Sequence, residues 1–232
     1  MRLVRRVPGR FAILACAAGV VLARPAAHAQ DVPQWPDTFL ARVQALALIQ
    51  TLNAEILGSA SATASLETWC RDHRLALDPT IVARPVTSVT RLAGAETRQR
   101  LEVGPADEIR FRRVQLRCGT RLLSEADNWY VPARLTRQMN HLLETTETPF
   151  GKVVAPLGPY RRTIAVQLLW TPLPHGWEQN VSPLSGAGGA LAIPAALFEH
   201  RAVLYTREHR PFSEVDEMYQ RDVLAFPPPA GR

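Results

Sequence analysis

The chain has 232 residues, of which 47% are hydrophobic and 21% charged, and 27 basic against 21 acidic residues give it a formal net charge of +6. Five of the basic residues lie in the first 29, so the rest of the chain holds 22 basic against 21 acidic residues and lacks the electrostatic surplus of a nucleic-acid binder. An apolar share near one half suffices for the core of a single domain of about 200 residues.

The first 29 residues have the three parts of a cleavable secretory signal. Four arginines form a cationic start, residues 11–23 are apolar, and Ala27-His28-Ala29 supplies the small residues of a cleavage site. The apolar stretch is well short of the roughly 20 residues that span a bilayer, and no later run reaches that length. We therefore predict cleavage of residues 1–29, a periplasmic or secreted protein, one domain at 30–232, and no membrane span after cleavage.

Two cysteines remain beyond the signal, Cys70 and Cys118. An oxidising compartment would allow a disulfide between them, whereas two cysteines cannot form a disulfide-rich scaffold. The alternative is a pair of buried free thiols that pack as small apolar side chains. Both alternatives stay open, because the sequence does not show whether the two Cα atoms lie within about 7 Å.

Two helices are predicted at the start of the domain. Over residues 39–57 apolar side chains recur with a period near 3.6, with Asp37 placed as the N-cap and Gly58 at the end. A second amphipathic helix is expected within residues 59–77. The stretch 80–92 is rich in Val, Ile and Thr, which predicts a strand.

A β-hairpin is predicted over residues 109–131, with its turn at Gly119-Thr120. In its first strand Arg112 follows the same alternation as Val114 and Leu116, which places it on the buried face. Arginine is seldom directed toward a core without an anion or acid to meet it, so Arg112 is a candidate binding residue. Its neighbours are expected on a solvated edge, namely Arg110, Arg113 and Arg117.

The rest of the chain predicts a short helix over 135–143, a turn at 148–151 and three more strands, at 160–170, 201–206 and 215–226. Residues 171–194 are rich in Pro, Gly and Ser and lose all periodicity, which indicates a long excursion or lid. This order of helices, strands, a short helix and further strands predicts an α+β domain with an antiparallel sheet.

The usual catalytic signatures are missing: the chain has no Gly-rich nucleotide loop, HExxH, GxSxG or CxxC. Its histidines lack metal-ligand spacing, so we expect no metal and no cofactor. What remains is a sparse pair of charged residues in strand-like segments, Arg112 and Glu217.

At this point several blocks resemble chorismate lyase and its superfamily, which also includes ligand-binding domains of certain bacterial transcription regulators. The blocks follow the family's order over most of the chain, and the resemblance rests on their succession: SAT at 61–63, RRVQL at 112–116, NWYVP at 128–132, TPFG at 148–151 and EMY at 217–219. It implies a six-stranded antiparallel sheet with helices on one face and a ligand enclosed beneath helical flaps.

The resemblance also implies the site. Chorismate lyase converts chorismate to 4-hydroxybenzoate and pyruvate without metal or cofactor, and its carboxylate-binding arginine falls at Arg112, its acid at Glu217 and an apolar pocket residue at Phe150. Ala62 takes the place of a Met-type contact, which leaves a roomier pocket. The chemistry suits these residues, because a guanidinium forms two parallel hydrogen bonds to a carboxylate and a carboxyl group can hold a ring oxygen or its proton.

Two alternatives concern this pair. Counting from Pro211 places the acid at Asp216, whereas the Met218-Tyr219 pattern places it at Glu217, which we prefer; a slip of one residue would turn the side chain to the opposite face. Alternatively, Arg112 and Glu217 form a buried structural ion pair.

Three functions are compatible with these observations. We expect a periplasmic binding domain for a small carboxylate or aromatic acid. The alternatives are a carbon–oxygen lyase that forms 4-hydroxybenzoate and pyruvate, and a structural or partner-binding protein with a vestigial pocket. Export argues against the lyase, because chorismate is a cytoplasmic intermediate, and a shared fold does not by itself transfer function.

Overall fold

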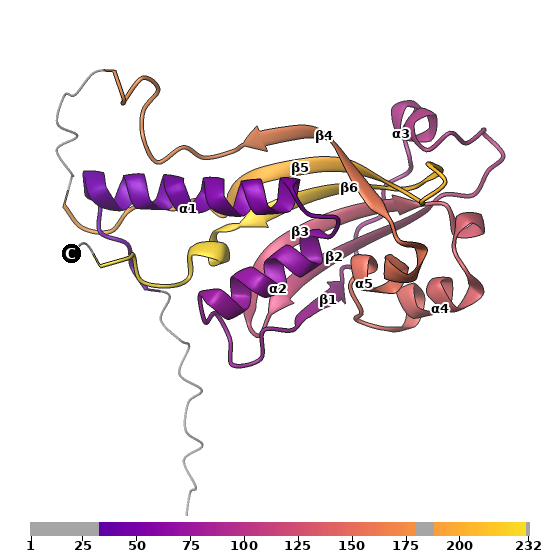
Figure 1. The fold of residues 1–232 in the computed structure, drawn as a ribbon, viewed down its shortest axis with the longest axis horizontal. Coiled ribbons are helices and arrows are strands. Elements are labelled where there is room, and N and C mark those ends of the chain that lie inside the picture. The colour runs from indigo at the N-terminus through magenta and orange to yellow at the C-terminus, as the bar shows by residue number, and fades with distance from the viewer. Residues whose placement is uncertain (1–32, 180–187, 231–232) are drawn as a thin grey trace, which may run out of the picture. The chain divides into compact units, whose positions relative to one another are not determined.

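The computed structural model describes residues 33–179 and 188–230. The predicted signal at 1–29 and the middle of the predicted excursion, residues 180–187, lie outside the described residues. In the described part, six strands form one antiparallel sheet in the order β1-β2-β3-β6-β5-β4 (Figure 1). The α+β class with a six-stranded antiparallel sheet is therefore confirmed.

The helices and strands differ from the predicted ones mainly at their ends. The α-helices are α1 (Phe39–Leu57), α2 (Ala62–Asp72), α3 (Ala95–Arg100), α4 (Arg137–Thr145) and α5 (Phe150–Val154). The strands are β1 (Ile81–Pro85), β2 (Arg110–Cys118), β3 (Arg121–Tyr130), β4 (Tyr160–Leu168), β5 (Ala196–Tyr205) and β6 (Pro211–Gln220).

Helix α1 has the predicted bounds but a different cap. The side chain of Thr38 accepts a hydrogen bond from the Ala41 N–H in the first turn at 3.2 Å, so the prediction of Asp37 as the cap was wrong. The Asp37 carboxylate instead lies 2.6 Å from Arg42 in an ion pair. Gly58 ends the helix as expected.

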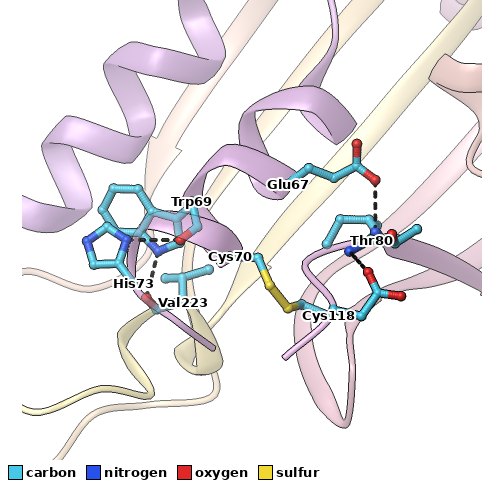
Figure 2. Close-up of a disulfide and its surroundings, with 9 residues drawn as sticks. Glu67, Trp69, Cys70, His73, Thr80, Cys118 and Val223 are labelled. Carbon is cyan, nitrogen blue, oxygen red and sulfur yellow. Dashed lines mark hydrogen bonds between the residues drawn. A yellow bond between two sulfur atoms is a disulfide. The ribbon is translucent and has the colours of Figure 1, made fainter. Parts of the chain in front are cut away.

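Helix α2 is fastened to the rest of the domain through its second half. Cys70 and Cys118 form a disulfide that joins α2 to the end of β2, with their Cα atoms 6.4 Å apart (Figure 2). The Trp69 indole N–H donates to the carbonyl of Val223 at 2.8 Å. The His73 ring packs between Trp69 and Phe226, with centroid distances of 3.9 and 4.3 Å. These contacts tie α2 to both the sheet and the C-terminal segment.

Three segments differ from the predicted ones at positions where a proline lies at the end or the start of an element. The first strand ends at Pro85, well before residue 92, and the unpredicted α3 follows after a loop. The Thr148-Pro149 turn leads directly into α5. The last strand, β6, starts at Pro211, earlier than predicted, and the chain after Gln220 turns into a 3₁₀ helix.

The two faces of the sheet are covered differently. The face that carries Arg112, Val114 and Leu116, here called the helix face, packs against α1, α2, α4 and α5 (Figure 1). The opposite face is covered at one end by the short α3, where Arg100 lies 2.8 Å from the fully buried Glu214. No helix in the described ranges is long and apolar enough to cross a membrane.

Candidate functional site

A cavity of about 300 Å³ lies between the helix face of the sheet and the N-terminal turns of α2 and α5. Its walls are mostly apolar side chains from the strands: Val114, Leu116, Ala126, Leu204 and Val215. All four residues predicted for the site line this one cavity, namely Ala62, Arg112, Phe150 and Glu217. The described ends of the 171–194 excursion do not line it.

Strand register sets the polar side chains of the cavity side by side. Arg112 on β2 lies opposite Asn128 on β3, and Asn128 lies opposite Val215 on β6. Two positions further along, Ala126 lies opposite Glu217. Because residues directly across antiparallel strands point to the same face, the alternation that places Arg112 inward places Asn128 and Glu217 inward too.

Arg112 is the least compensated charge of the cavity. Its Nη2 atom donates one long hydrogen bond, 3.4 Å, to the carbonyl of Thr146, and its buried Nη1 atom has no hydrogen-bond partner among the described residues. No carboxylate of the described chain forms an ion pair with it. Burial lowers the pKa of Arg112, although a guanidinium keeps its charge in proteins. A buried cation with free donors is costly unless an anion meets it.

Glu217 is compensated from within the protein. The Nη2 atom of Arg161 on β4 lies 2.6 Å from its Oε2 atom, and the Tyr219 hydroxyl donates to the same oxygen at 3.1 Å. Burial would lower the pKa of Arg161, but the nearby Glu217 carboxylate raises it overall. Burial and the charge of Glu217 raise the pKa of Tyr219 well above its usual value, so the hydroxyl stays a donor. The alternative of a structural Arg112–Glu217 ion pair therefore does not hold, because Glu217 pairs with Arg161 instead.

Asp216, the alternative acid, points the other way. It lies on the opposite face of the sheet, where its carboxylate accepts a hydrogen bond from Arg201 at 3.1 Å. It lines a separate polar depression together with Asp127 and Glu199. The structure thus places Glu217, and not Asp216, at the cavity.

The other two predicted residues form the apolar end of the cavity. Phe150 begins α5, and its ring packs against Tyr130 and Phe212 with centroids 5.7 and 6.3 Å away. Ala62 begins α2, directly after Ser61, which caps that helix. A Cβ atom on Gly151 would lie 2.9 Å from the Ser61 hydroxyl oxygen, so the two helix starts approach closely.

A buried histidine lies beside Glu217 on the neighbouring strand. His200 on β5 is directly opposite Glu217 on β6, and its Nε2 atom forms a 2.6 Å hydrogen bond with the side chain of Asn53. Its Nδ1 atom is buried and has no hydrogen-bond partner within residues 33–179 and 188–230. Burial, followed by the nearby positive charge of Arg161, lowers the pKa of His200 to about 4, so the ring is neutral at neutral pH.

Arg161 was not predicted as a site residue. From the apolar positions Ile164, Val166 and Leu168, simple alternation would turn Arg162 inward and Arg161 outward. The pairing of β4 with β5 shifts by one residue between Thr163 and Ala165, which reverses the alternation and buries Arg161. Asn128 was within the NWYVP block but had no role assigned; its strand alternation was the available signal.

The arrangement of the cavity suits recognition of an anion. The described residues contain no group of three or more His, Cys, Asp and Glu side chains placed to hold a metal ion. The cavity instead combines one uncompensated guanidinium, one internally paired acid and apolar walls.

The chain is similar to one protein over most of its length and to several solved structures more distantly. No protein-family model matches the chain. The chain is 47% identical over 215 residues to "Uncharacterized protein y4mC" of Sinorhizobium fredii, covering 91% of each protein. The effector domain of PhnF from Mycobacterium smegmatis matches with a TM-score of 0.45 and 14% identity, over 72% of this chain and 91% of that one. The "possible transcriptional regulator YydK" of Bacillus subtilis matches with a TM-score of 0.37 and 14% identity, over 60% of this chain and 57% of that one.

Proposed function

The chain belongs to one family with protein y4mC of Sinorhizobium fredii, and from its cavity we propose that it is a binding protein for a small carboxylate with an aromatic or other apolar body. Three groups of residues that line the cavity support this proposal. Arg112 would bind the carboxylate, the apolar side chains would contact the ring or chain of the ligand, and Asn128 and Glu217 lie where a polar substituent would be.

The single observation that carries the proposal is the state of Arg112. It is buried in an apolar cavity with a free Nη1 donor and no carboxylate partner in the described chain. Leaving such a charge uncompensated costs free energy, whereas a carboxylate ligand would accept two parallel hydrogen bonds from it. The unliganded protein thus keeps an anion site ready at some cost to its stability.

The size and lining of the cavity define the rest of the ligand. A volume of about 300 Å³ is at the lower end of the range for small-molecule sites. Phe150 and the apolar strand residues suit a flat ring or a short apolar chain. Asn128 and the polar group around Glu217 would meet a polar substituent of the ligand.

We further propose that the protein acts after export, in the periplasm or outside the cell, because of the signal pattern in residues 1–29. That location supports binding over chorismate lyase activity. The internal pairing of Glu217 points the same way, since its Oε2 atom is already engaged by Arg161 and Tyr219.

The test is a thermal-shift series with benzoate, 4-hydroxybenzoate and aliphatic carboxylates of similar size. We expect at least one aromatic acid to raise the melting temperature of the protein, since a ligand at 100 times its Kd stabilises the folded state by about 2.7 kcal/mol. The shift should disappear in Arg112→Gln. It should remain in the matched control Arg117→Gln, which removes an arginine of the same strand that lies outside the cavity.

Two outcomes would contradict the proposal. If no carboxylate stabilises the well-folded protein, the cavity is not a carboxylate site. If incubation with chorismate yields 4-hydroxybenzoate and pyruvate at a rate that Arg112→Gln abolishes, the protein is a lyase and not a binding protein.

A further inference from the structure

The two edges of the sheet differ in how their backbone is covered. At the β1 edge, the Ile81 N–H donates to the Glu67 carboxylate at 2.9 Å and the Ala83 N–H donates to the Glu147 carbonyl at 2.7 Å. This strand is also only five residues long and ends in a proline. Short length, proline and covering groups are the usual ways in which proteins protect a sheet edge from pairing.

The β4 edge has no such cover in the described chain. It is the last strand in the sheet order, and all residues from 164 to 169 are exposed. Four of them are apolar, with exposed fractions of 37–44%: Ile164, Val166, Leu168 and Leu169. No charged residue lies between Arg162 and the end of this stretch. An exposed, uncharged and apolar edge strand readily accepts another strand.

We propose that β4 pairs with β4 of a second copy of this chain, antiparallel about a twofold axis, so that two six-stranded sheets become one continuous sheet. A strand on this edge would satisfy the free backbone groups of β4 and cover its apolar side chains. A twofold dimer brings identical strands together in antiparallel orientation, which is the orientation of every pair already in this sheet.

The residues beyond the register shift are complementary to themselves. With the axis at Gln167, Val166 lies opposite the partner's Leu168, and Ala165 lies opposite Leu169 of the partner subunit. The two Gln167 amides meet at the axis, where each can donate to and accept from the other. Arg161 and Arg162 lie before the shift and outside the paired stretch, so no like charges face each other. This complementarity is the reason to choose a second copy over a different partner.

The test is a charge-swap experiment at the axis. Size-exclusion chromatography with light scattering should give the wild-type protein twice the molar mass of one chain. Gln167→Lys should give a monomer, because it sets two lysines directly opposite each other, and Gln167→Glu should do the same. An equimolar mixture of the two variants should form the dimer again. Leu92→Lys, a change at a fully exposed apolar residue away from β4, should leave the dimer intact.

Each contrary result overturns the proposal. A monomeric wild type means that a segment of the same chain or nothing at all covers the edge. A dimer that persists in Gln167→Lys uses another surface. A mixture that stays monomeric, while circular dichroism shows both variants folded, excludes pairing centred on Gln167.

Discussion

Two neighbouring arginines of β2, Arg112 and Arg113, lie on opposite faces of the same sheet and meet different surroundings. Arg113 donates to both carboxylate oxygens of Asp127, at 2.5 and 2.6 Å, and Arg91 donates to the same carboxylate at 2.8 Å. In the part of the chain that the structure describes, Arg112 has one long hydrogen bond to a backbone carbonyl and an Nη1 donor without a partner.

The pKa values of the two guanidinium groups shift in opposite directions. The hydrogen bonds to Asp127 raise the pKa of Arg113, whereas burial lowers the pKa of Arg112. Arg113 on the opposite face thus has its carboxylate partner within the protein, whereas Arg112 on the helix face has none among the described residues. A charged residue is a candidate for ligand binding when the fold buries it without supplying its partner.

The largest expected loss of unfolding free energy follows from removing the disulfide that joins the helix layer to the sheet. The Cys70–Cys118 disulfide closes a segment of 48 residues between α2 and β2, both of which line the cavity. A loop of this length predicts that Cys70→Ala with Cys118→Ala lowers the free energy of unfolding by about 4 kcal/mol. Urea unfolding measures it, with and without reductant. Equal stability of the wild-type and double-variant proteins under oxidising conditions would contradict a stabilising role for the bridge.

The next effect would test whether Asp127 is structural. Asp127 is 4% exposed, and Asp127→Ala leaves Arg113 without its carboxylate. We expect a loss of about 3 kcal/mol, at the lower end for breaking a buried pair because Arg113 is partly exposed. Thermal shift by an aromatic acid should persist in this variant. Loss of ligand binding at unchanged stability would reverse the roles assigned to the two faces.

Lowering the pH should reduce the free energy of unfolding, because His200 is buried as a neutral ring on the helix face of the sheet. The pKa of this ring is about 4 in the folded protein and about 6.5 in the unfolded chain, so the unfolded state binds the extra proton first. The contribution of the neutral His200 ring to the free energy of unfolding is therefore complete well above pH 6.5 and is lost as the pH falls toward 4. Between pH 8 and pH 5 the loss is about 2 kcal/mol. Urea titrations at both pH values should show a smaller loss in His200→Gln than in wild type. Identical pH profiles would show that His200 does not contribute.

The smallest expected change in the free energy of unfolding is that of Arg112→Gln, which contrasts with the large loss expected for Asp127→Ala. In the absence of ligand, Arg112→Gln should change the free energy of unfolding by less than about 1 kcal/mol, since it removes a buried charge that has no carboxylate partner. Differential scanning calorimetry measures this value. A loss as large as that of Asp127→Ala would make Arg112 a structural residue.

Much of the site could be predicted from strand alternation and the order of sequence blocks. The position of Arg112 with Val114 and Leu116 on one face follows from the period of two, and it is where the structure places it. The same rule separates Glu217 from Asp216 once the register is known. The solvated edge predicted for Arg113 was wrong, because its partner Asp127 lies on the adjacent strand and only pairing brings the two together.

The sequence by itself determined the α+β class, the bounds of α1 and the hairpin, and the inward side of β2, because these depend on local periodicity and on the turn at Gly119-Thr120. Only the tertiary structure decided which charges meet. The register shift in β4 turned Arg161 toward Glu217, and no carboxylate of the described residues pairs with Arg112. Ion pairing depends on distances between strands far apart in the chain, and one inserted residue in one strand is enough to change it.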